Sequence, residues 1–332
     1  MAEQGDRKVI VFAASFLDEP ITESPNAGAA RSMLEKAAAQ AGVAVDYRCT
    51  RNPSRALEAA ELEGAVAVIA DLEHYDRQLL RQVGDGCGGP LALIARYGVG
   101  YTSVDIEAAK ECGVLVTNTP AANASPTAEW AVATMLDVAG KRRFHHQRAA
   151  AGQSKAGTMR LDLGGKTLGI VGTGTVGKRV AALLRGFDMR VLAYDLYPDS
   201  DWAAANGVDY VELPTLYENA DFVTLHASSA ETIIGKAELD RMKHTAVLVN
   251  CARGHLVDNR EAYQAVAEGR LWGYGLDEVW EYSDLSLDEV NVVVSPHVGS
   301  DTDFGKENMK MMSARAVATF LRGEKPDYVV NR

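Results

Sequence analysis

A glycine-rich segment in the middle of the chain constrains its fold more than any other feature. Residues 172–177 read GTGTVG and follow the apolar stretch 167–171, which predicts a β-strand. Gly172 allows a tight turn, Gly174 lets a pyrophosphate approach the backbone, and Gly177 lets the following helix pack closely on the strand. The first amide groups of that helix face the bound anion. The pattern therefore predicts the strand, turn and helix of a dinucleotide-binding fold.

The residues after this turn support the same interpretation. Apolar residues at i, i+4, i+7 and i+8 give the predicted helix one apolar face: Val176, Val180, Leu183 and Leu184. The stretch 189–194 predicts a second strand, and Asp195 directly follows it. An acid at this place accepts hydrogen bonds from the adenosine ribose and repels the 2′-phosphate of NADP. No arginine follows before Pro198, so the predicted cofactor is NAD.

Composition limits the classes of protein to consider. A chain of 332 residues, 47% of them hydrophobic, can bury a large core, and its length favours two domains. The net charge of −11 disfavours nucleic acid or an anionic membrane as a partner. The N-terminal residues 1–8 carry mixed charge before a short apolar run, which predicts a first strand rather than a signal peptide or membrane span.

The cysteines show no CxxC motif and no metal-ligand spacing. They are Cys49, Cys87, Cys112 and Cys251. This spacing predicts neither a disulfide framework nor a metal site, and it favours a reducing, cytoplasmic location.

Short apolar runs alternate with helical patterns along the chain, which predicts parallel sheets with helices on both faces. In the first part, Asn26 is a candidate cap for a helix that ends at Gly42, and Ser125-Pro126 is a candidate start for a long helix. The last helix is expected at about 306–321, and the tail at 328–330 is expected to return to the first domain. Further strands are expected at 9–12, 43–47, 65–70, 91–95, 114–116, 222–226, 246–251, 274–276 and 292–295.

Several ordered segments together resemble the D-isomer-specific 2-hydroxyacid dehydrogenase family over nearly the whole chain. They are YGVGY at 97–101, VTNTP at 116–120, AE at 128–129, the glycine turn, NCARG at 250–254, GLD at 275–277 and SPHVG at 295–299. The resemblance implies two doubly wound α/β domains. Residues 1–119 and 304–332 would form a flavodoxin-like substrate domain, and 120–303 an inserted Rossmann NAD-binding domain. It also implies a homodimer through the NAD-binding domain and a reaction that interconverts a 2-keto acid and a D-2-hydroxy acid, with closure of the two domains around a hinge near Pro120 and Phe304.

Two residues are candidates for the chemistry. Arg253 follows a predicted strand at the sheet edge where ligands bind, and its guanidinium can polarise a carbonyl. His297 follows Pro296 at another strand end, and an imidazole can exchange a proton near neutral pH. The resemblance implies that the backbone amides of Val99 and Gly100 hold the substrate carboxylate.

The resemblance also implies a set of cofactor contacts. Asp277 matches an aspartate that contacts the nicotinamide carboxamide, and His226 is expected to pack rather than to act as a second base. The full set is Thr127, Gly172, Gly174, Thr175, Val176, Gly177, Asp195, His226, Ala227, Cys251, Ala252, Asp277, His297 and Gly299.

One departure from the family pattern affects the mechanism. The family has a glutamate five residues after the position of Asp277, where it keeps the pKa of the catalytic histidine high, but this chain has Tyr282 there. A one-residue slip that brings Glu281 to His297 is the favoured explanation. Glu278 or Asp284 could take the role instead, or the carboxylate could be absent, which would lower the pKa of the histidine.

The expected substrate is a small or medium 2-keto acid. The segment 71–75, DLEHY, is expected in the substrate pocket and carries no arginine, which disfavours phosphorylated substrates. Two other functions remain open: an NAD(H)-binding corepressor or redox sensor on the same fold, and a dehydrogenase for formate or phosphite. The retention of Arg253 and His297 favours the 2-hydroxyacid dehydrogenase.

Overall fold

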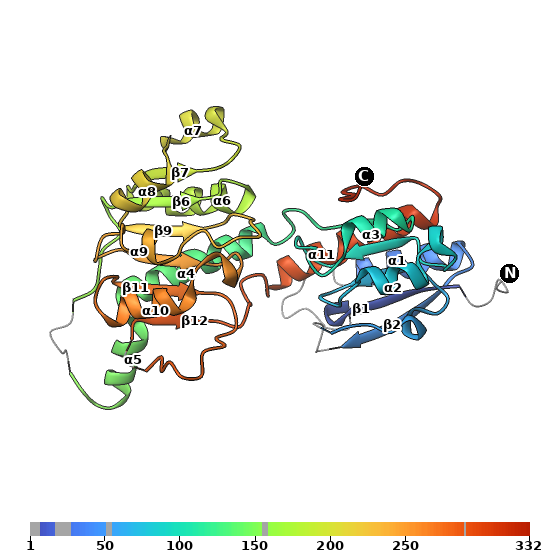
Figure 1. Ribbon diagram of the computed structural model, residues 1–332, viewed down its shortest axis with the longest axis horizontal. Helices are drawn as coiled ribbons and strands as arrows, with labels where there is room; N and C mark the ends of the chain where they lie inside the picture. The colour runs from blue at the N-terminus through green and yellow to red at the C-terminus, as the bar shows by residue number, and fades with distance from the viewer. Residues whose placement is uncertain (1–6, 17–27, 51–54, 155–158, 289) are drawn as a thin grey trace. The chain divides into compact units, whose positions relative to one another are not determined.

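The computed structural model describes residues 7–16, 28–50, 55–154, 159–288 and 290–332. The chain forms two compact units (Figure 1). The first unit comprises Met1–Asn123 and Thr302–Arg332, and the second comprises Ala124–Asp301. These boundaries lie within a few residues of those expected at 119/120 and 303/304.

The first unit contains a five-stranded parallel sheet. Its order is β2-β1-β3-β4-β5, the flavodoxin-like order of a doubly wound sheet. The strands are β1 (Lys8–Ala13), β2 (Ala44–Thr50), β3 (Ala65–Ala70), β4 (Leu93–Arg96) and β5 (Leu115–Thr117). This order places β3 and β4 side by side, so the segments that follow them lie at one edge of the sheet.

Helices cover both faces of this sheet. On one face, Leu34 of α1 (Ala29–Gln40) and Met309 of α11 (Asp303–Leu321) join one apolar cluster. On the other face, α2 (Arg77–Val83) and α3 (Ile106–Glu111) pack through a second cluster. The short helices of the unit are η1 (Ala14–Phe16), η2 (Ala59–Leu62) and η3 (Asp85–Cys87). Asn26 lies outside the described residues, and α1 begins after Gly28.

The C-terminal tail returns to the first unit, as the sequence predicts. Val329 forms an antiparallel bridge with Thr117, and the amide of Val330 donates to the carbonyl of Val116 at 2.9 Å. Both ends of the chain therefore build this unit.

The second unit contains a seven-stranded parallel sheet in the order β12-β11-β10-β9-β6-β7-β8. The part from β8 to β11 has the Rossmann strand order, and β12 extends it. The strands are β6 (Thr167–Val171), β7 (Arg190–Tyr194), β8 (Val208–Tyr210), β9 (Phe222–Leu225), β10 (Val247–Asn250), β11 (Gly273–Leu276) and β12 (Val292–Val294). The predicted fold class, two doubly wound α/β domains, is confirmed.

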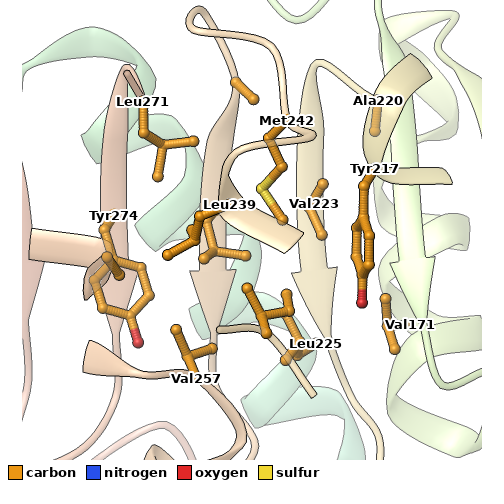
Figure 2. Close-up of a cluster of buried hydrophobic side chains, with 14 of the residues drawn as sticks. Val171, Tyr217, Ala220, Val223, Leu225, Leu239, Met242, Val257, Leu271 and Tyr274 are labelled. Atoms are coloured by element: carbon orange, nitrogen blue, oxygen red, sulfur yellow. The ribbon is translucent and has the colours of Figure 1, made fainter. Parts of the chain in front are cut away.

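Two apolar clusters cover the two faces of the second sheet. Figure 2 shows one of them, in which Tyr217, Leu239 and Tyr274 pack against side chains of the central strands. The other contains residues of α4 and α6. The helices of this unit are α4 (Ala124–Gly140), α5 (Arg142–Ala150), α6 (Thr175–Leu184), η4 (Arg185–Phe187), α7 (Ser200–Asn206), α8 (Leu213–Asn219), α9 (Lys236–Leu239), η5 (Gly254–Leu256) and α10 (Asn259–Ala267).

Two sequence-based expectations need correction. The helix expected to be capped by Ser125 and to begin at Pro126 begins two residues earlier, at Ala124. Pro126 lies in its first turn, where no intrahelical N–H bond is lost. Cys87 and Cys112 form a disulfide with their Cα atoms 5.1 Å apart. The expectation of no disulfide is therefore wrong, and the cysteines do not support the inference of a reducing location. Among the described residues, no helix is both long and apolar enough to cross a bilayer.

Candidate active site

The glycine turn between β6 and α6 has the geometry that a dinucleotide requires. Gly172 has φ +94°, and a Cβ there would lie 2.6 Å from the amide nitrogen of Ala227. A Cβ on Gly177 would lie 2.1 Å from the carbonyl oxygen of Gly172, so glycine alone permits this helix-to-strand packing. A Cβ on Gly174 would meet nothing within 4 Å. The space beside Gly174, next to the N-terminal amides of α6 that begin at Thr175 and Val176, fits a pyrophosphate.

Asp195 follows β7 and lies beside this turn. Its Oδ2 accepts hydrogen bonds from the amide and hydroxyl of Thr173 at 2.6 and 3.0 Å, and its Oδ1 accepts from the amide of Tyr197 at 2.9 Å. Partial burial opposes ionisation, but the hydrogen bonds from Tyr197 and Thr173 lower the pKa of Asp195 overall. An ionised carboxylate here suits a ribose diol and disfavours a 2′-phosphate.

His226 and Ala227 follow β9 and place their backbone against Gly172. The His226 Nε2 lies 3.0 Å from the hydroxyl of Thr224. Burial lowers the pKa of His226 to about 4, so this imidazole is neutral at physiological pH. A neutral, half-buried ring suits packing beside the cofactor turn better than proton donation.

Arg253 follows β10 on a turn that Asn250 shapes. The Asn250 side chain donates to the carbonyl of Arg253 at 2.8 Å and accepts from the amide of Ala252 at 3.1 Å. One Nη of Arg253 donates to the carbonyl of Ala252 at 2.7 Å. Its other N–H groups have no hydrogen-bond partner within the described part of the chain. The guanidinium is therefore held at one side and open to a ligand at the other.

Asp277, at the end of β11, organises the loop that carries His297. Its Oδ1 accepts from the hydroxyl of Ser295 at 2.6 Å and from the amide of Val298 at 2.9 Å. Its Oδ2 accepts from the amide of Gly299 at 2.8 Å. Asp277, which the resemblance assigns to the nicotinamide carboxamide, thus also holds this loop in place.

His297 lies on this loop with a left-handed backbone, φ +57°. Its Nδ1 is 3.3 Å from the Oε2 of Glu278. This hydrogen bond raises the pKa of His297, although burial and the charge of Arg253 act in the opposite direction. The same hydrogen bond lowers the pKa of Glu278, with a smaller contribution from Arg253. The three side chains therefore form one electrostatic group at the ends of β10, β11 and β12.

The carboxylate beside His297 is Glu278, and the favoured prediction of Glu281 is wrong. Glu278 directly follows Asp277 at the strand end, and it packs so closely on Gly254 that a Cβ there would lie 2.9 Å from its Cγ. Asp284, another alternative, binds Arg260 at 2.8 Å. The family spacing points to position 282, which is Tyr282, whereas Glu278 lies two residues after the end of β11. A carboxylate this close to the strand end was the sequence feature that pointed to it.

The segment 97–101 of the first unit presents amide groups. The carbonyl of Val99 accepts from the side chain of Asn118 at 2.8 Å, and that of Gly100 accepts from Nε of Arg96 at 2.8 Å. The amides of Val99, Gly100 and Tyr101 have no hydrogen-bond partner among the described residues. Consecutive free amides of this kind form a site for an anion.

The remaining predicted residues lie in both units. Thr127 is in the first turn of α4, and Cys251 is a buried thiol whose pKa burial raises. In the segment 71–75, Glu73 is fully buried, and burial raises its pKa to about 7. His74 is exposed. No group of three or more His, Cys, Asp or Glu in the described ranges is arranged to bind a metal.

Comparison with known proteins identifies the family. Residues 132–299 match the model of the D-isomer specific 2-hydroxyacid dehydrogenase, NAD binding domain. A glyoxylate reductase of Korarchaeum cryptofilum is 38% identical over 255 residues, which cover 73% of this chain and 76% of that protein. A glyoxylate reductase of Thermococcus litoralis is 34% identical over 286 residues, which cover 82% and 84%.

The solved structures agree with these relatives. The apo-structure of D-lactate dehydrogenase from Escherichia coli aligns with a TM-score of 0.76 and 26% identity, over 97% of this chain and 99% of that one. The NAD-binding turn, the sheet order and these matches support one another. The chain belongs to the D-isomer specific 2-hydroxyacid dehydrogenase family.

Proposed function

We propose that this NAD-dependent oxidoreductase interconverts a 2-keto acid and a D-2-hydroxy acid through Arg253 and His297, with Glu278 as the partner of the histidine. The observation that carries the assignment of residues is the 3.3 Å contact between His297 and Glu278, beside Arg253. The family relationship supports the reaction itself.

The side chains divide the work of carbonyl reduction. When bound, NADH supplies the hydride that adds to C2 of the keto acid. Negative charge then develops on the carbonyl oxygen, where the open side of the Arg253 guanidinium stabilises it. His297 donates the proton from Nε2, because its Nδ1 faces Glu278. In the reverse direction the neutral imidazole accepts the hydroxyl proton.

The substrate carboxylate is assigned to the segment 97–101. The free amides of Val99 and Gly100 can bind an anion without adding a counter-charge. The names of the relatives support a small 2-keto acid such as glyoxylate or pyruvate. The segment 71–75 contains no arginine for a phosphate, which agrees with this choice.

The proposal includes a homodimer formed through the second unit. Exposed apolar side chains of that unit, among them Leu136 on α4 and Phe144 on α5, support a contact with a second copy. Light scattering after size-exclusion chromatography should give twice the mass of the chain. A monomer at micromolar concentration would contradict this part of the proposal.

The assignment of Arg253 and His297 can be tested by substitution. Arg253→Ala and His297→Ala should each lower kcat by about a hundredfold or more, because each removes stabilisation or proton transfer in the transition state. NADH affinity, measured by fluorescence titration, should stay nearly unchanged. Arg260→Ala, which removes an exposed arginine of the same unit, is the matched control and should behave like the unaltered protein. Equal loss of NADH affinity in both active-site variants would contradict the assigned roles.

A further inference from the structure

One buried guanidinium, that of Arg96, holds the segment 97–101 in place. Arg96 is the last residue of β4, and it is only 4% exposed. Its Nη1 donates to the carbonyls of Ala70 and Tyr97 at 3.0 and 3.1 Å, and its Nε donates to the carbonyl of Gly100 at 2.8 Å. A planar guanidinium can make these bonds together, whereas an ammonium group has one donor centre. Arg96 thus joins the end of β3 to both ends of the turn.

Two further residues complete the support. The Thr119 hydroxyl accepts from the amide of Gly98 at 3.1 Å, and the amide of Thr119 donates to the carbonyl of Gly98 at 3.0 Å. Asn118 binds the carbonyl of Val99. Every carbonyl from residue 97 to residue 100 is therefore occupied by a donor. This arrangement leaves the amides of residues 99–101 as the free groups of the turn.

The charged guanidinium of Arg96 also lies close to the backbone of residues 97–101. Gly98 has φ +139°, and a Cβ there would lie 3.4 Å from Nη2 of Arg96. A buried cation at this distance raises the electrostatic potential at the neighbouring amides, and the low dielectric of the interior strengthens the effect. The fully buried Glu73 interacts electrostatically with Arg96 and partly offsets that charge.

We propose that Arg96 is a positioning residue for the substrate carboxylate. The Arg96 side chain holds the amides of residues 99–101 in their ligand-binding orientation and adds its positive charge to the partial positive charge of those amides. This inference rests on the proposed function in one respect, that the ligand of the turn is the carboxylate of a 2-keto acid. Arg96 itself need not touch the substrate.

The test compares two variants with a control. Arg96→Met keeps the length of the side chain but removes its donors and charge, and Arg96→Lys keeps the charge but replaces the planar fork. Arg81→Met is the control, because Arg81 is an exposed arginine of α2 in the same unit. For each protein, KM and kcat for a 2-keto acid are measured at saturating NADH. The dissociation constants of NADH and of oxamate from the NADH complex are measured by calorimetry.

Arg96→Met should raise both KM and the oxamate dissociation constant by about tenfold or more, the loss expected for a charge-assisted hydrogen-bond network. Arg96→Lys should fall between Arg96→Met and the unaltered protein. kcat and NADH affinity should change little, and Arg81→Met should change nothing. Oxamate affinity that is unchanged in Arg96→Met would overturn the proposal. So would a loss of kcat and NADH affinity without a change in KM.

The outcomes separate this inference from the proposed function. If Arg96→Met does not fold, as judged by circular dichroism, Arg96→Lys decides alone, and an unchanged oxamate affinity in that variant overturns the proposal. If the unaltered protein binds oxamate but reduces no 2-keto acid, the proposed function fails while the oxamate titrations still test Arg96.

Discussion

At the level of single residues, the proposed mechanism gives Glu278 control of the pH range in which His297 can donate a proton. Its carboxylate stabilises the imidazolium and raises the pKa of His297 above the ordinary 6.5. Keto-acid reduction needs the protonated ring, so activity should persist as pH rises until it falls through this raised value. Oxidation of the hydroxy acid needs the neutral ring and should show the opposite dependence.

The first prediction concerns this pair. Glu278→Gln should move the falling limb of kcat/KM for reduction to lower pH, because the neutral amide no longer favours the imidazolium. Glu281→Gln is the matched control and should leave the limb in place. pH profiles of NADH oxidation check both variants. A falling limb that shifts in Glu281→Gln but stays in place in Glu278→Gln would contradict the observed contact.

A second residue-scale prediction concerns the buried Glu73. Burial raises its folded-state pKa from 4.5 to about 7. Between these values the folded protein keeps a proton that the unfolded chain releases, so Glu73 makes stability fall as pH rises through this window. The full effect is about 3 kcal/mol.

The variant Glu73→Gln should remove this dependence. Relative to the unaltered protein it should gain stability between pH 5 and pH 8, and any pH-independent effect of the amide cancels in that comparison. Urea unfolding followed by circular dichroism measures the gain. Glu63→Gln, an exposed substitution in the same unit, should show none. If the free energy of unfolding of Glu73→Gln changed between pH 5 and pH 8 by the same amount as that of the unaltered protein, Glu73 would not be protonated in the folded state.

Residue patterns predicted the site only in part. Arg253 and His297 could be located because each follows an apolar strand and lies in a distinctive motif. The partner of His297 was named only as one of several alternatives, because the pairing depends on how the chain leaves β11. In the structure Glu278 lies two residues after the end of that strand and packs on Gly254. Arg96 gave no signal, because a lone arginine at a strand end does not reveal which carbonyls it meets.

At the scale of elements, the glycine turn gives a third prediction with opposite outcomes at two positions. Gly174→Ala should leave the stability of the apo protein nearly unchanged, since its Cβ meets nothing, but it should weaken NADH binding by blocking the pyrophosphate. Gly177→Ala should lower stability first, because its Cβ would meet the carbonyl of Gly172. Thermal melting and NADH titration check both. A Gly174→Ala variant with normal NADH affinity would contradict the placement of the pyrophosphate.

Element prediction worked where a strand is a continuous apolar run. The bounds of β3 and β6 agree with the sequence patterns at 65–70 and 167–171. β8 was not predicted, because Val208–Tyr210 has only three residues, and its one central residue is an aspartate. Its strand conformation depends on pairing with β7. The start of α4 was misplaced because a Ser-Pro pair also fits inside the first turn of a helix.

At the scale of the whole molecule, the two units can be observed separately. All four tryptophans, at positions 130, 202, 272 and 280, belong to the second unit, whereas helices of both units contribute to circular dichroism. All tryptophan fluorescence therefore comes from residues of the second unit. The disulfide between Cys87 and Cys112 belongs to the first unit and closes a segment that contains β4, residues 97–101 and α3.

The fourth prediction uses this separation. Cys87→Ser should destabilise the first unit by about 3.5 kcal/mol, the chain-entropy value for a loop of this length. The part of the circular dichroism transition that comes from the first unit should move to lower denaturant, and the transition seen by tryptophan fluorescence should not move. Cys49→Ser is the control, because Cys49 is not disulfide-bonded. Identical circular dichroism transitions for Cys87→Ser and the unaltered protein under oxidising conditions would contradict a stabilising disulfide.

In the proposed function, the second unit binds NADH, and Arg253 and His297 use it to reduce a 2-keto acid. The most direct measurement is NADH oxidation with glyoxylate and pyruvate, with the configuration of the product determined by chiral chromatography. We expect that NADH is consumed and that pyruvate gives D-lactate. Tight NADH binding without turnover of any 2-keto acid would contradict it and favour a cofactor sensor, and NAD reduction by formate or phosphite alone would contradict the assigned substrate class.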